Sequence, residues 1–344
     1  MNNTKRTRFI EKILSSIGQE KSGLTVSDVK LKKSTETETE NELLFFFKPE
    51  CFFNGDTKQI KAILEMVFDK FTEFKVDISG ILLFDGKRLE ELSVMDRHYG
   101  FINRISKEAS KMVSKEDSKK IQLALSIDNI ENYELLGGHE ALKRYPEFNE
   151  KLLDEFWQTK KSIKLRSGFY IQQYSIKEQQ VILANGFHPS QLKHYTNPLH
   201  KIVLLLLNSH TDWKILKNDL AGDTFPEWAK GDSIRGEIFG NRQKYGIQNV
   251  SISNNCVHLS AGPFEALFEI NNFLSNIKDI DFSLDKTNIA RLMNKNGFEK
   301  EEIRRCLLNP KIQIDEIPTD LFTLTEEKNS NEAISEYRKY FIEP

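Results

Sequence analysis

Four separated segments of the sequence carry residue types that proteins use for catalysis. They are Phe47-Lys48-Pro49-Glu50, Arg97-His98-Tyr99, the stretch from Ala221 through Thr224 and Pro226 to Arg235-Gly236-Glu237, and Asn255-Cys256-Val257-His258-Leu259-Ser260. A histidine is a nucleophile only as neutral imidazole, with one ring nitrogen available to attack and the other held by an acceptor. A lone histidine in a strand is more often structural, so the significance of these segments depends on their occurring together.

The segment around His258 has the alternation of a short strand, predicted over Cys256 to Ser260. Because side chains alternate between the two faces of a strand, Cys256, His258 and Ser260 are expected on one face. A helix is predicted to begin at Pro263, since proline suits the first helical position. Glu265 on that helix is a candidate acceptor for the imidazole.

Taken together, the four segments resemble the nucleoside diphosphate kinase family. That family has K-P-D after its first strand, H-Y in a following helix, G-x-T-x-P…T-I-R-G-D, and N-x-x-H-G-S-D. The order is the same here, and 11 positions separate Thr224 from Arg235 and His258 from Glu269, as in the family. The resemblance covers roughly residues 43–104 and 200–273, about two-fifths of the chain.

The resemblance implies ping-pong phosphoryl transfer through a phosphohistidine. His258 would be the nucleophile and Glu269 would orient its imidazole, with Glu265, one turn earlier, as the competing carboxylate. Lys48 and Arg235 would be the cations that meet the charge of the transferring phosphoryl group.

Further ligands of the nucleotide follow from the same resemblance. The partners are nucleoside triphosphates and diphosphates, and Mg²⁺ is expected to arrive on the phosphates without a protein cage of its own. Ser260 would support the carboxylate that orients the histidine. The remaining residues expected beside the phosphates and the sugar are Tyr99, Thr224, Asn255 and, as a substitute cation, Lys217.

The chain departs from the family pattern at several positions. The family's arginine before Gly-x-Thr falls on Asn218, and the neighbouring Lys217 can replace its charge but not its bidentate geometry. The glycine after the nucleophile is Leu259, and the aspartate after Lys-Pro is Glu50. An insertion replaces the short helix that supplies an aromatic platform and an arginine, for which Phe101 and Arg104 are the nearest residues.

Three functions therefore stay open from the sequence. The first is a divergent nucleoside diphosphate kinase-like phosphotransferase, favoured by Lys48, Arg235 and His258. The second is a nucleotide-binding sensor or regulatory subunit with little turnover, favoured by Asn218, Leu259 and the insertion. The third is a nucleotide hydrolase at the same site.

The hydrophobic pattern predicts an α+β protein, an α/β sandwich built on a ferredoxin-like four-stranded antiparallel sheet with helices on one face. The expected strands are Leu43–Phe47, Val76–Phe84, Lys201–Leu207 and Cys256–Ser260. They alternate with helical patterns at residues 60–71 and 88–97. Residues 42–106 and 199–282 would form this core.

Three further regions surround the expected core. Residues 1–41 are predicted to be a helix, Lys5–Ile17, and a polar linker, and residues 107–198 a mainly helical insertion with one hairpin, Phe169–Gln173 and Gln180–Leu183. Residues 283–344 are predicted as a helical extension. Its pair of helices, Thr287–Lys295 and Glu299–Leu307, fits a packed helical hairpin better than a DNA-binding motif, because three glutamates begin the second helix.

Composition excludes several classes of protein. The 344 residues hold 49 Lys and Arg against 51 Asp and Glu, so the chain lacks the positive field of a general nucleic-acid binder. The longest apolar run, Ile202–Leu207, is too short to span a membrane. Three cysteines without a CxxC pair predict a cytoplasmic protein with neither disulfides nor a zinc site. A homo-oligomer or a protein partner at the insertion remains an open expectation.

Overall fold

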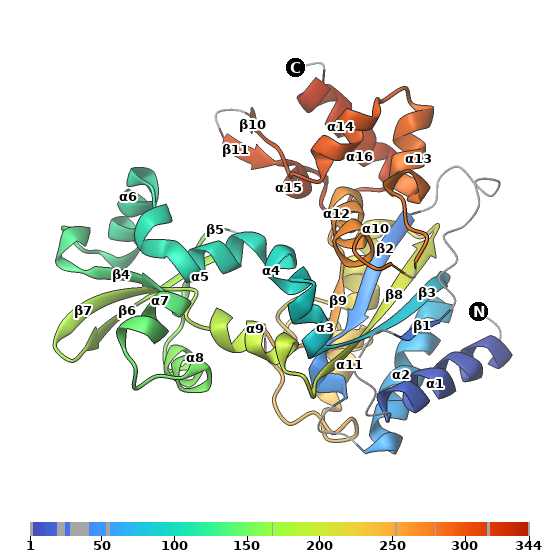
Figure 1. Ribbon diagram of the computed structural model, residues 1–344, viewed down its shortest axis with the longest axis horizontal. Coiled ribbons are helices and arrows are strands. Elements are labelled where there is room, and N and C mark those ends of the chain that lie inside the picture. The colour runs from blue at the N-terminus through green and yellow to red at the C-terminus, as the bar shows by residue number, and fades with distance from the viewer. Residues whose placement is uncertain are drawn as a thin grey trace. The chain divides into compact units, whose positions relative to one another are not determined.

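The chain divides into two units, which are described separately here: residues 1–88 with 198–344, and residues 89–197. The computed structural model (Figure 1) describes residues 3–18, 25–27, 41–52, 56–166, 168–251, 253–278, 280–314 and 317–342. Most of the predicted polar linker, residues 28–40, lies outside this range. No helix of the described residues is long and apolar enough to cross a membrane.

The first unit is built on a five-stranded antiparallel sheet with the order β1-β3-β8-β2-β9. Its strands are β1 (Thr25–Ser27), β2 (Asn41–Phe47), β3 (Val76–Asp85), β8 (Lys201–Ser209) and β9 (Val257–Leu259). The α+β class and the four predicted strands are confirmed, and β1 is an additional edge strand. The strand β2 lies between β8 and β9.

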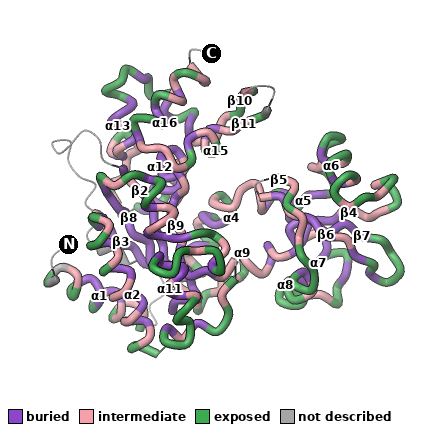
Figure 2. Tube along the Cα trace, turned by 180° about the vertical axis from the view of Figure 1, so that it is seen from behind, coloured by how far each residue is buried: buried purple, intermediate pink, exposed green. Residues whose placement is uncertain are grey.

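Helices cover both faces of this sheet, not the one face predicted. Phe45 packs edge-on against Phe71 of α2 (Thr57–Glu73), with ring centroids 5.2 Å apart. The next residue, Phe46, points to the opposite face, where its ring centroid lies 6.0 Å from that of Phe273 of α12 (Pro263–Leu274). The sequence shows two apolar faces on β2 but does not say which helix covers each. The strands and the inward sides of these helices are the buried parts of this unit in Figure 2.

Short helices complete the first unit around the sheet. The N-terminal helix α1 (Asn3–Ile17) packs on α2, close to the predicted range. The helix predicted at residues 88–97 is instead two, because Ser93 adopts a left-handed conformation with φ of 50°. The remaining short elements are η1 (Pro49–Cys51), α3 (Gly86–Glu91), α10 (Trp213–Ile215), the π-helix η3 (Leu216–Ala221) and α11 (Ile234–Gly240).

The second unit contains a four-stranded sheet of order β4-β7-β6-β5, so the mainly helical insertion holds two strands in addition to the predicted hairpin. The predicted hairpin is confirmed as β6 (Phe169–Ile176) and β7 (Gln179–Ala184). The strands β4 (Glu134–Gly137) and β5 (Ile163–Arg166) have only four residues each, too few for a periodic signal. Its helical elements are α4 (Val94–His98), α5 (Gly100–Met112), α6 (Lys115–Leu125), η2 (Ile130–Asn132), α7 (Gly138–Arg144), α8 (Glu150–Gln158) and α9 (His188–Thr196).

The C-terminal extension belongs to the first unit. Its predicted helical pair, α13 (Asn288–Lys295) and α14 (Lys300–Cys306), packs into an apolar cluster around Tyr337. The extension is not purely helical, since β10 (Lys311–Ile314) pairs with β11 (Ile317–Asp320). The other elements are η4 (Leu284–Lys286), α15 (Leu321–Thr325), α16 (Ser330–Tyr337) and η5 (Arg338–Ile342).

The substitution Phe45→Ala should destabilise the first unit by about 3–5 kcal/mol, because it removes a fully buried ring and leaves a cavity. Thermal unfolding followed by circular dichroism measures the effect. Leu308→Ala is the matched control, since Leu308 is 80% exposed and its loss should leave the melting temperature almost unchanged. Equal melting temperatures for the two variants would contradict this assignment of the core.

Candidate functional site

The structure brings His258, Glu269 and Ser260 together at the edge of the sheet. Nε2 of His258 lies 2.7 Å from Oε1 of Glu269, and the Ser260 hydroxyl donates to Oε2 of the same carboxylate at 2.5 Å. Glu269 is only 1% exposed, so its charge needs both partners. One buried carboxylate thus fixes the histidine and the serine at once.

The pairing of β9 with β2 fixes Ser260. Its backbone N–H donates to the Leu44 carbonyl at 3.0 Å, and its hydroxyl accepts the Leu44 N–H at 3.1 Å. The indole Nε1 of Trp213 donates to the Ser260 carbonyl at 3.0 Å. These long-range bonds have no sequence signal, so the contributions of Leu44 and Trp213 could not be predicted.

The two candidate carboxylates on α12 have different partners. Glu265, one turn before Glu269, accepts the Ala261 N–H at 2.7 Å rather than bonding to His258. Burial, and then the nearby charge of Glu269, raises the pKa of Glu265 to about 8. The structure therefore distinguishes the two: Glu269 contacts the imidazole, and Glu265 closes the turn before the helix.

His258 is held as a neutral imidazole. Burial, with added repulsion from Lys48 and Arg235, keeps its pKa well below the ordinary value. The ring stacks on Phe46, with centroids 4.6 Å apart and planes 20° apart. Because Nε2 donates its proton to Glu269, the electron pair that can attack resides on Nδ1.

Lys48 is a buried cation directly after β2. Its ammonium donates to Oδ1 of Asn255 at 2.6 Å and to the Ser253 carbonyl at 3.3 Å. Burial lowers the pKa of Lys48 to about 8, against the attraction of Glu50. The Glu50 carboxylate itself accepts the Cys256 N–H at 2.8 Å, a contact that the sequence did not indicate.

Arg235 supplies the second cation from the first turn of α11. Its guanidinium donates to the Gly222 carbonyl at 2.7 Å and to the Val257 carbonyl, beside His258, at 3.0 Å. The following residue must be small, because a Cβ at Gly236 would lie 1.9 Å from the Lys230 carbonyl. Steric contact with the Lys230 carbonyl thus explains why glycine follows Arg235 in the motif.

Asn255 links Lys48 to the loop that carries Thr224. Its Nδ2 donates to the Thr224 carbonyl at 3.1 Å, while its Oδ1 accepts from Lys48. Thr224 itself is exposed on that loop. The loop and the first cation are therefore joined through one amide side chain.

Cys256 does not share the face of His258 and Ser260, which corrects the sequence prediction. Its φ of 68° places it in the left-handed region, outside the regular strand. Its side chain instead belongs to the apolar cluster that includes Val257 and Leu259. Strand alternation therefore applies only from Val257 onward.

Lys217 and Tyr99 have other partners in the structure. The Lys217 ammonium pairs with the carboxylates of Glu326 and Glu327, the latter at 3.1 Å, and Asn218 also donates to Glu327 at 3.1 Å. Lys217 would have to leave these partners to bind a nucleotide. Tyr99 lies in the second unit, where its hydroxyl bonds to that of Tyr195 at 3.1 Å.

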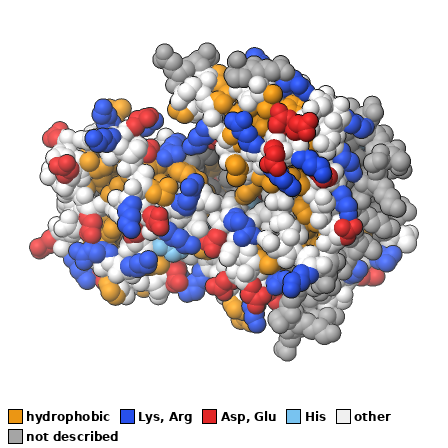
Figure 3. Space-filling view, turned by 45° about the horizontal axis from the view of Figure 1, so that its top comes forward, with side chains coloured by type: hydrophobic (Ala, Val, Ile, Leu, Met, Phe, Trp, Pro, Cys, Tyr) orange, Lys and Arg blue, Asp and Glu red, His pale blue; other side chains and the backbone are white. Residues whose placement is uncertain are grey.

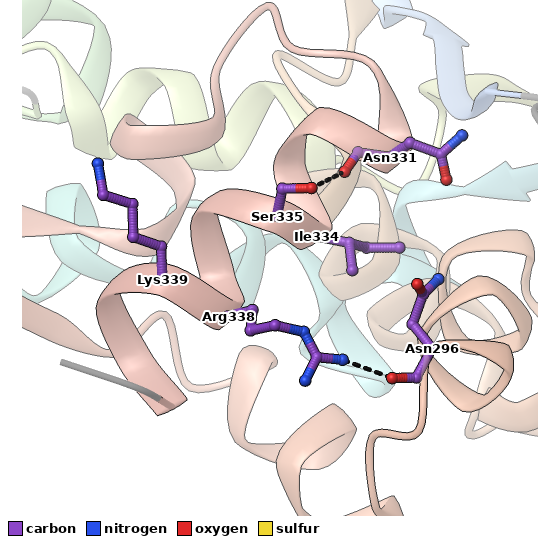
Figure 4. A pocket seen from close by; sticks show the side chains of 6 residues that line it. All are labelled: Asn296, Asn331, Ile334, Ser335, Arg338 and Lys339. Atoms are coloured by element: carbon purple, nitrogen blue, oxygen red, sulfur yellow. Dashed lines mark hydrogen bonds between the residues drawn. The ribbon is translucent and has the colours of Figure 1, made fainter.

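A pocket of about 530 Å³ occurs in the C-terminal extension. Figure 4 shows its lining, with Ser335 bonded to Asn331 and Arg338 directed toward Asn296. Arg338 also lies over the Phe298 ring, 4.3 Å from its centroid. These contacts join helices within the extension.

Comparisons with known proteins add little to this geometry. No family model matches the chain, and no curated protein matches it. Among solved structures, an NDP kinase from Pyrobaculum aerophilum is similar with a TM-score of 0.34 and 15% identity, over 68% of this chain and 96% of that chain. A likeness this low carries no argument. The fold and the site together define an α+β protein with a buried His-Glu-Ser cluster flanked by two cations.

Lys48→Met should raise the pKa of His258 toward its ordinary value, because it removes a positive charge that opposes protonation of the imidazole. Titration of the His258 ring by NMR measures the shift, with His258→Gln used to assign the signal. Lys300→Met is the control, since Lys300 is well exposed and pairs with Asp285. An unchanged His258 titration in Lys48→Met would contradict the electrostatic coupling.

Proposed function

We propose that this chain is a nucleoside diphosphate kinase-like phosphotransferase on a ferredoxin-like core. It moves the γ-phosphate of a nucleoside triphosphate to His258 and then to a nucleoside diphosphate. The observation that carries the proposal is the neutral His258 imidazole, held through Nε2 by buried Glu269 with Lys48 and Arg235 close by.

The chemistry follows from these contacts. Nδ1 of His258 attacks the γ-phosphorus, the bond from that phosphorus to the bridging oxygen breaks, and the nucleoside diphosphate leaves. The proton on Nε2 stays in its bond to Glu269, whose charge stabilises the cationic ring. An acceptor diphosphate then takes the phosphoryl group by the reverse reaction, so atoms and charge balance over the cycle.

Lys48 and Arg235, together with Mg²⁺ on the nucleotide, would stabilise the negative charge of the phosphates. Lys48 and Arg235 are positioned by carbonyl and amide oxygens, so they need little reorganisation in the transition state. The buried carboxylates of Glu50 and Glu269 already have partners, which supports Mg²⁺ bound by the nucleotide phosphates and not by a protein cage. A cytoplasmic location remains a prediction.

The core topology also supports the proposal. Without the edge strand β1, the strands in chain order β2, β3, β8 and β9 have the sheet order β3-β8-β2-β9, as a ferredoxin-like sheet requires. The site lies where β2 and β9 meet. Positive and negative side chains are interspersed on the face in Figure 3, unlike the single-sign surface of a general nucleic-acid binder.

A nucleotide-binding sensor is the second candidate function. The ion pairs of Lys217 with Glu326 and Glu327 favour it, because they tie a cation near the motif to the C-terminal extension. A sensor would bind nucleotide and take up label slowly or not at all. Transfer of label to an acceptor therefore distinguishes the two functions.

Incubation with γ-labelled ATP and Mg²⁺ should label the wild-type chain at an acid-labile, alkali-stable bond, as a phosphohistidine requires. His258→Ala should lose the label, and His210→Ala, which changes an exposed histidine, should keep it. Added nucleoside diphosphate should remove the label as labelled triphosphate. Label that persists in His258→Ala would contradict the phosphohistidine mechanism. Label that forms but is never transferred to a nucleoside diphosphate would favour the sensor.

The rate of labelling should fall as the pH rises through about 8, because Lys48 loses its proton and its positive charge there. Lys48→Arg should remove this alkaline limb, since an arginine stays charged over the same range, even if its rate is lower. Single-turnover labelling from pH 6 to pH 10, roughly the span that brackets the lysine titration, makes the comparison. Parallel profiles in the two proteins would exclude Lys48 as the titrating group.

A further inference from the structure

The loop that follows Gly222 carries an exposed aromatic pair beside the candidate site. Trp228 is 69% exposed, the largest exposed ring among the described residues, and it stacks on Phe225 with centroids 4.3 Å apart and planes 27° apart. A single exposed apolar side chain is ordinary. Two rings stacked on each other, with much of the outer ring in solvent, form a flat surface that a third ring can cover.

The loop holds this pair in a fixed position. The Phe225 N–H donates to the Asp223 carboxylate at 2.8 Å, and the Trp228 N–H donates to the Phe225 carbonyl at 2.9 Å. At its start, the Gly222 carbonyl accepts from Arg235 at 2.7 Å. The indole is therefore presented by an ordered turn, at a lower entropic cost than a mobile side chain would have.

The same loop is tied to the cations of the candidate site. Lys48 bonds to Asn255, Asn255 bonds to the Thr224 carbonyl, and Phe225 is the next residue. A ligand whose phosphates lie at Lys48 and Arg235 would thus have the aromatic pair within the reach of its other end. A nucleotide has this form, with an anionic tail and a flat aromatic base.

We propose that Phe225 and Trp228 form the stacking platform for the nucleobase of the substrate. The proposal rests on the proposed function and adds to it the class of ligand, a purine nucleotide. Stacking accepts any base because each has a π-face, and the larger purine covers more of an indole than a pyrimidine does. The protein should therefore bind purine nucleotides more tightly than pyrimidine nucleotides, while still binding both.

The test compares ligands with and without a base on matched variants. Calorimetric titration should show that Trp228→Leu binds ATP about tenfold or more weakly than the wild type, since an aromatic stack contributes about that much. Binding of inorganic tripolyphosphate, which has no base, should be unchanged. Trp228→Phe keeps an aromatic ring and should restore most of the ATP affinity, and the preference for ATP over CTP should shrink in Trp228→Leu.

Fluorescence gives a second readout, because Trp157 and Trp213 are buried and Trp228 is not. ATP should quench the wild-type emission, and this quench should vanish in Trp228→Leu. An ATP affinity that is unchanged in Trp228→Leu overturns the platform. This holds also if the variant alters self-association of the protein, since an exposed tryptophan that serves only a contact between copies would not bind the base. If His258 is labelled but Trp228→Leu binds ATP as tightly as the wild type, the platform is wrong and the proposed function stands. If ATP binding depends on the base but no label forms on His258, the proposed function is wrong and the platform stands.

Discussion

The buried carboxylate of Glu269 is the constraint on which the site depends. A charge removed from water is tolerated only when it is paired and hydrogen-bonded, and here the partners are His258 and Ser260. Ser260 is fixed in turn by Leu44 of β2 and by the Trp213 indole. The carboxylate therefore requires β2, β9 and α12 to be placed together.

The charges around this carboxylate follow one physical logic. Lys48 and Arg235 are largely buried, and protein oxygens, not solvent, orient both. Burial and then the field of these cations lower the pKa of His258, so the cations that would bind phosphate also favour the nucleophilic form of the ring. A polyanionic ligand would meet this local positive charge although the chain as a whole is nearly neutral.

The sequence was informative where a local signal exists. The apolar run at residues 43–47 predicted the strand β2, and the family resemblance implied a contact between His258 and Glu269 that is present at 2.7 Å. Pairings without local signal were missed, such as the four-residue strand β4 and the ion pairs of Lys217 with residues 109 and 110 positions away. The presence of helices on both faces of the sheet was also missed. The side-chain pattern along a strand shows that a face is apolar, but it does not identify the element that packs against that face.

The pairing of β2 with β8 and β9 has a kinetic consequence. Leu44 and Ser260, whose bonds join the first and last strands of the core, are 216 positions apart, and the whole second unit lies between β3 and β8. Closing so long a loop is slow, and β2 has no strand partner until β8 and β9 are synthesised. Until then the Leu-Leu-Phe-Phe-Phe strand has two open edges, which makes the nascent chain prone to aggregate and dependent on rapid completion of its C-terminal third.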